Sequence, residues 1–171
     1  CMKRWFPLVA VVAAMFSVEL AGVRAEGKAD GAKAAGAEKG YVSLWNGKDL
    51  SEWKVGKNAG SWSVKDGELV VHGPGPAHLF YEGPVHGHDF KNFHLKAEVM
   101  TFPHAKSGSY FHTKFQEEGW PAQGFEAQVN QTHADPKKTG GLYAVKDVMN
   151  VPPAEDGKWF LYEIIVEGKH V

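Results

Sequence analysis

Residues 124–130 read GFEAQVN, and their strict alternation of apolar and polar side chains decides the fold class. Alternate side chains of an extended strand face opposite sides of its sheet. The apolar side chains are Phe125, Ala127 and Val129. The polar side chains are Glu126, Gln128 and Asn130. We expect the apolar face to pack, while a row of one carboxylate and two amides suits a polyhydroxylated ligand. The alternative is an ordinary solvated strand face.

The rest of residues 41–171 consists of short alternating or aromatic runs between turn-forming residues. We predict strands at 41–44, 62–64, 68–72, 79–81, 93–101, 109–115, 125–130, 141–145 and 159–167. This region has no sustained apolar period of 3.6 residues. Many short strands with frequent turns predict an all-β protein, either a sandwich or a jelly roll.

Two other predicted strands also carry polar faces. In 93–101 the outward side chains include Glu98, and in 109–115 they include His112. If these strands neighbour strand 125–130 in a curved sheet, Glu98, His112 and Glu126 would line one concave surface.

The N-terminal residues predict export. Lys3 and Arg4 precede an apolar run over 5–18, and small residues lead up to Ala25. We interpret residues 1–25 as a secretory signal peptide, 26–40 as a flexible Ala/Gly/Lys tether and 41–171 as one domain. The apolar run is too short for a comfortable membrane span, so we expect no stable span after signal cleavage.

Composition limits the possible partners. The chain of 171 residues has 19 Lys and Arg against 20 Asp and Glu, with no basic stripe, which argues against nucleic acid as a partner. Its only cysteine, Cys1, allows no internal disulfide. At the other end, Gly168 and Lys169 resemble a tight turn, and residues 170–171 begin a returning strand. We therefore expect the sandwich to be incomplete at the C-terminus.

Five blocks of sequence occur in the order found in one known family. They are residues 41–53, 62–69, 107–111, 124–128 and 139–143. The chain resembles the 3-keto-disaccharide hydrolases, also described as 3-keto-glucoside 1,2-lyases and 3-keto-2-hydroxyglucal hydratases. The resemblance implies a concanavalin A-like jelly-roll sandwich, export to the periplasm or exterior of glycan-degrading bacteria, and a carbohydrate substrate oxidised at C3. Two positions depart from the family: His112 stands where Arg is usual, and Asn130 where Asp is usual.

The implied chemistry begins at the C2 proton, which a ketone at C3 acidifies. A general base removes it, the glycosidic oxygen leaves C1 by β-elimination, and water then adds. We predict Glu126 as the base. His112 is either an acid/base partner or a ring in the place of a substrate-binding Arg. Lys146 either stabilises the enolate or is a solvated loop lysine. The predicted substrate-binding residues are Glu98, Trp120, Gln128, Asn130 and Tyr143.

The sequence predicts no metal site. His86 and His88 flank a glycine, but a pair without further clustered ligands is a weak signal. A divalent cation that polarises the keto oxygen is compatible with the reaction, although no residue set demands one. The alternative to an enzyme is a non-catalytic, lectin-like carbohydrate-binding module, because fold alone does not fix function.

Overall fold

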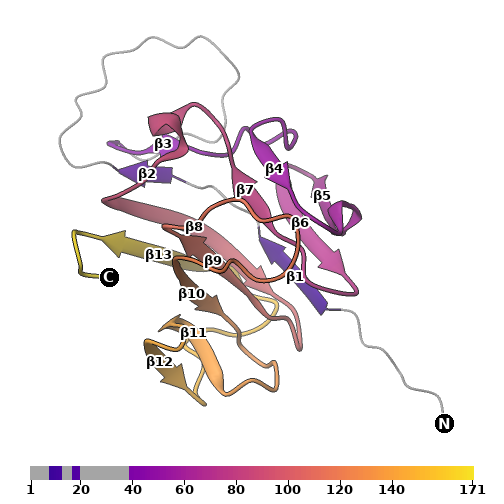
Figure 1. Ribbon diagram of the computed structural model, residues 1–171. Helices are drawn as coiled ribbons and strands as arrows, with labels where there is room; N and C mark the ends of the chain where they lie inside the picture. Colours follow the sequence, from indigo (N-terminus) through magenta and orange to yellow (C-terminus); the bar gives the residue numbers. More distant parts are fainter. Residues whose placement is uncertain (1–7, 13–16, 20–38) are drawn as a thin grey trace.

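The computed structural model describes residues 8–12, 17–19 and 39–171 (Figure 1). Its strands are β1 Leu8–Val12, β2 Ser17–Glu19, β3 Val42–Ser43, β4 Trp53–Val55, β5 Trp62–Lys65, β6 Glu68–Gly73, β7 Leu79–Tyr81, β8 Phe93–Thr101, β9 Ser107–Phe111, β10 Phe125–Val129, β11 Lys137–Leu142, β12 Lys146–Met149 and β13 Phe160–Val166. Two short 3-10 turns, η1 Ala59–Ser61 and η2 Val85–His88, are the helical elements of the described residues. The all-β prediction is confirmed.

The strands form two main sheets. The larger has seven strands in the order β3-β2-β8-β1-β6-β5, with β13 paired to β8 as well. The smaller has four antiparallel strands in the order β12-β11-β10-β9, and β4 and β7 form a separate pair. β10, the strand with the alternating pattern, is thus an inner strand of the smaller sheet.

The core lies between the two sheets. Its buried side chains come mainly from β8 and β13 on one side and from β9 and β10 on the other, with Leu44 just after β3. The rings of Phe93 in β8 and Phe111 in β9 meet edge to face, with centroids 5.8 Å apart. The Tyr162 hydroxyl in β13 donates to the Ala127 carbonyl oxygen in β10 at 2.8 Å. The domain is therefore a β-sandwich of the predicted concanavalin A-like jelly-roll class.

Part of the predicted signal peptide is paired in the larger sheet. β1 pairs with β6 and β8, and β2 pairs with β3 and β8. Export and removal of residues 1–25 stay predictions. The predicted tether, residues 26–40, lies outside the described residues except at Lys39 and Gly40.

Two predicted strands differ in extent. The strand expected at 109–115 ends at Phe111, because His112 adopts a left-handed backbone with φ of 53° and turns the chain away. The strand expected at 141–145 is a hairpin instead, in which β11 ends at Leu142 and β12 begins at Lys146. Ala144, with φ of 59°, lies in the connecting turn.

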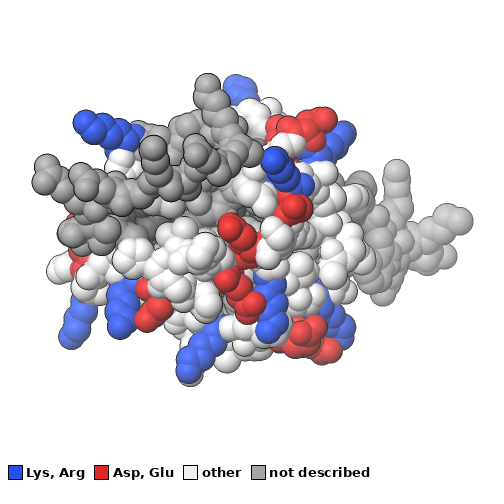
Figure 2. All heavy atoms as spheres, turned by 90° about the horizontal axis from the view of Figure 1, so that it is seen from above, with Lys and Arg blue, Asp and Glu red and all other residues white. Residues whose placement is uncertain are grey.

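The surface carries both signs of charge. Figure 2 shows basic and acidic residues next to one another on the face seen from above. In the part of the chain that the structure describes, no helix is long and apolar enough to cross a membrane.

Candidate active site

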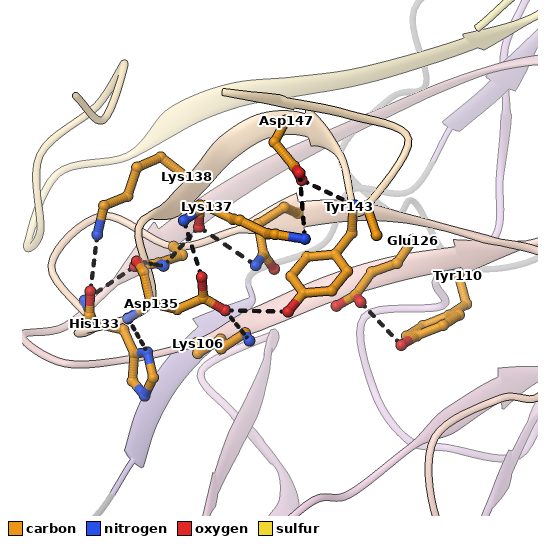
Figure 3. A network of polar contacts seen from close by, with 12 residues as sticks. Lys106, Tyr110, Glu126, His133, Asp135, Lys137, Lys138, Tyr143 and Asp147 are labelled. Atoms are coloured by element: carbon orange, nitrogen blue, oxygen red, sulfur yellow. Dashed lines mark hydrogen bonds and ion pairs between the residues drawn. The ribbon is translucent and has the colours of Figure 1, made fainter. Parts of the chain in front are cut away.

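The site is built on two neighbouring strands, β9 and β10. Their antiparallel register places Tyr110 directly opposite Glu126. The Tyr110 hydroxyl donates a hydrogen bond to Glu126 Oε2 at 2.9 Å (Figure 3). A carboxylate and a phenol on adjacent strands therefore form one hydrogen-bonded pair on the polar face of the smaller sheet.

The surroundings of this pair raise the pKa of both groups. Burial raises the pKa of Glu126 above its ordinary value of 4.5, and the hydrogen bond from Tyr110 and the charge of Lys106 offset only part of this effect. Burial, and next the Glu126 charge, raise the pKa of Tyr110. Glu126 is thus a stronger base than an exposed glutamate, and Tyr110 keeps its proton as a donor.

An ion pair lies next to the carboxylate. Lys106 Nζ is 2.6 Å from Asp135 Oδ2, and the Tyr143 hydroxyl donates to the same oxygen at 3.3 Å (Figure 3). The hydrogen bond from Lys106 is the largest influence that holds the pKa of Asp135 at about 2. Burial lowers the pKa of Lys106, but the hydrogen bond to Asp135 and the charges of Asp135, Tyr143 and Glu126 together outweigh burial, so the net shift is upward. Both groups stay charged at neutral pH.

Lys137 is the second cation of the site, and it contacts the Tyr143 ring. Lys137 Nζ lies 4.0 Å from the centre of the Tyr143 ring and 3.2 Å from Asp147 Oδ2. Lys106 Nζ lies 5.0 Å from the same ring. The backbone N–H of Tyr143 donates to the Glu126 carbonyl oxygen at 2.8 Å, which fixes the Tyr143 backbone beside β10. Two ammonium groups are thereby held close to the carboxylate, where they can stabilise negative charge on a ligand.

Aromatic rings extend the site beyond Tyr110. The His78 ring meets Tyr110 edge to face at 6.1 Å and Trp120 at 5.8 Å. Burial lowers the pKa of His78, so this imidazole is neutral at neutral pH. The Trp120 side chain is 58% exposed. Its loop is held by Gln116, whose Nε2 donates to the Trp120 carbonyl oxygen at 2.9 Å and whose Oε1 accepts from the Ala122 N–H at 3.1 Å.

The structure brings three of the predicted site residues into this neighbourhood: Glu126, Tyr143 and Trp120. Gln128 and Asn130, predicted to bind substrate hydroxyls, are fully buried at 1% and 0% exposure. Asn130 Nδ2 donates to the carbonyl oxygens of Asp135 at 3.0 Å and Lys137 at 2.8 Å. The Asn130 amide therefore holds the loop that presents Asp135.

The other three predicted residues lie elsewhere. β8 is in the larger sheet and not beside β9 or β10, so Glu98 is not brought to Glu126. His112 is exposed beyond the end of β9, with Nε2 2.9 Å from the Lys91 carbonyl oxygen. Lys146 is exposed at the start of β12. The cations whose charges act on Glu126 are Lys106 and Lys137.

Sequence reasoning missed five residues of the site: His78, Lys106, Tyr110, Asp135 and Lys137. The alternation of the strand at 109–115 had a usable signal, because it puts Tyr110 on the polar face. For Asp135 and Lys137 no comparable signal exists, since Asp135 lies in the loop between β10 and β11 and Lys137 begins β11, and only the folding of this segment back on β10 brings them there. His86 and His88 lie in η2, and among the described residues no group of three or more His, Cys, Asp or Glu side chains is placed to hold a metal ion.

The sandwich and its half-buried carboxylate define the class: a lectin-like β-sandwich domain with an ionisable site on one sheet. A family model described as 3-keto-alpha-glucoside-1,2-lyase-like domain matches residues 40–171. The chain belongs to this family, as the resemblance of its sequence blocks indicated. No curated protein and no solved structure matches the chain. The family description indicates a lyase-like domain that acts on glycosides.

Proposed function

We propose that the chain is an exported, periplasmic or extracellular bacterial enzyme that cleaves 3-keto-α-glucosides by β-elimination. The observation that carries the proposal is the half-buried Glu126 carboxylate with a raised pKa and a hydrogen bond from Tyr110. A base that removes a carbon-bound proton near neutral pH needs such a pKa. The family match supplies the substrate class.

Each bond change has a group to serve it. Glu126 takes the C2 proton, and the electron pair forms a C2=C3 enolate with negative charge on the C3 oxygen. The ammonium groups of Lys106 and Lys137 stabilise that charge. The enolate collapses to C3=O as C1=C2 forms and the C1–O bond breaks; the departing oxygen takes a proton from water on the opposite face of the ring, and Glu126 returns a proton to C2 on hydration. Water then adds across C1=C2 to give the free 3-keto sugar.

Incubation with methyl 3-keto-α-glucoside tests the proposal. We expect release of methanol and formation of the conjugated 3-keto-2-hydroxyglucal, which ultraviolet absorbance detects. In D₂O, we expect the final sugar to carry deuterium at C2. Sugar binding without product and without C2 exchange would instead establish the lectin-like binding module.

The hydrogen-bonded pair of Glu126 and Tyr110 leads to a prediction for the pH dependence of kcat/KM. Because Glu126 acts deprotonated and burial raises its pKa, we expect kcat/KM to fall with acid at an apparent pKa above 4.5. Tyr110→Phe removes a hydrogen bond that lowers the pKa of Glu126, so the acid limb should move to still higher pH. Steady-state kinetics between pH 4 and 9 measure both. An acid limb at or below 4.5 would contradict this assignment.

Trp120 gives a prediction on binding. An exposed indole beside His78 can stack on a sugar ring, and we take as the scale of this contact the roughly 0.5–1.5 kcal/mol that a pair of aromatic rings contributes. We expect Trp120→Ala to raise KM for a 3-keto-disaccharide about 2- to 10-fold with little change in kcat. Trp159→Ala is the matched control, because Trp159 is 42% exposed in a separate hollow lined by residues 152–155 and 158–160. Equal effects of both variants would exclude stacking at Trp120.

A further inference from the structure

One face of β9 has a gap between two functional side chains. Gly108 and Tyr110 are alternate residues of β9 and so share this face, and Lys106 immediately precedes the strand. Lys106 pairs with Asp135, and Tyr110 donates to Glu126. Gly108 lies between them, opposite Gln128 of β10.

The Glu126 side chain occupies that gap. A Cβ built on Gly108 would lie 2.4 Å from Glu126 Oε1, 2.8 Å from its Cγ and 3.0 Å from its Cδ. These three nearest atoms all belong to Glu126, and real Cβ atoms do not approach side chains so closely. Gly108 is not among the residues with positive φ, so its backbone conformation does not require glycine. What requires glycine is the carboxylate that lies against it.

We propose that Gly108 is a positioning residue for Glu126. Its missing side chain lets the carboxylate lie flat against the β9 backbone, within reach of the Tyr110 hydroxyl and shielded from water. The same contact contributes to the burial that raises the pKa of Glu126. The consequence for turnover rests on the proposed function, whereas the placement of the carboxylate does not.

Gly108→Ala tests the proposal by titration. The added methyl group pushes the carboxylate out of the gap towards solvent, so the Glu126 pKa should fall towards 4.5, as measured by ¹³C NMR of the carboxyl group. On methyl 3-keto-α-glucoside, kcat should fall about 10- to 100-fold, the effect of a small misplacement, with KM nearly unchanged. Gly60→Ala is the matched control, because its Cβ meets nothing within 4 Å. The control should titrate and turn over like the wild type.

A double-mutant cycle in Tm keeps the test independent of activity. In the wild-type background, Gly108→Ala should lower Tm, because the added methyl group collides with the Glu126 side chain. In the Glu126→Ala background this collision is absent, and Gly108→Ala should leave Tm unchanged or raise it, because alanine restricts the unfolded chain more than glycine does. An equal loss of Tm in both backgrounds, or a wild-type Glu126 pKa in Gly108→Ala, would overturn the proposal. A pKa shift in a protein that never turns over 3-keto-glucosides would support the role of Gly108 and reject the proposed function.

Discussion

Replacing Glu126 by Gln is expected to lower kcat on a 3-keto-α-glucoside by about 10²–10⁴-fold, the contribution typical of a general base. The amide keeps the size of the side chain but cannot accept a proton from C2. It can still accept the Tyr110 hydrogen bond through its Oε1, so the strand pairing and KM should change little. Initial rates of enone formation, together with deuterium exchange at C2, measure the loss.

Glu98→Gln provides the matched control. Glu98 is an exposed glutamate on β8 in the other sheet, so its amide variant should keep wild-type kcat. If Glu126→Gln retained wild-type turnover, Glu126 could not be the base. If instead Glu98→Gln lost activity, the site would lie on the larger sheet.

Phe93→Ala is expected to reduce the free energy of unfolding by about 3–5 kcal/mol. Phe93 is 7% exposed and meets Phe111 of the facing sheet edge to face. Truncation leaves a cavity between the two sheets, which the relatively rigid strands close only in part. Urea denaturation followed by tryptophan fluorescence measures the change.

Phe125→Ala tests the specificity of that loss. Phe125 stacks on the same Phe111 ring but is 41% exposed, so its truncation opens no enclosed cavity and should cost clearly less. Equal losses at both positions would mean that the interface between the sheets is not the main core.

The fold was predictable because alternation is a local property. In the strand 93–101, alternation predicts that Phe93, Leu95, Ala97 and Val99 face inward; Phe93, Ala97 and Val99 are buried, and Leu95 is half-buried against the same core. The strand order was not predictable to the same degree, because pairing depends on contacts far apart in the chain. Glu98 and Glu126 have similar sequence contexts, and only the assignment of their strands to different sheets separates them.

Residues of the site were predictable from the sequence only where they lie on a strand with an alternating pattern. Glu126 follows from alternation alone. Its neighbours Gln128 and Asn130 share its face but are buried, and Asn130 bonds to the backbone of Asp135 in the loop between β10 and β11 and of Lys137 at the start of β11. A two-residue period cannot show that a loop will fold back over one end of a strand. This loop brings Asp135 to Lys106, and the place of Asp135 in the site could not be predicted from the sequence for the same reason.

The loop that bears Trp120 is fastened by its own residue, Gln116, while β10 is fixed by β9 and by the Tyr162 hydroxyl. No residue takes part both in the Gln116 hydrogen bonds that hold the loop and in the strand pairing and Tyr162 hydrogen bond that hold β10. Under the proposed function, we expect mutations at the tip of this loop to alter which leaving groups are accepted while Glu126 keeps its hydrogen bond to Tyr110. A domain arranged in this way can evolve a new substrate range while it retains one chemistry.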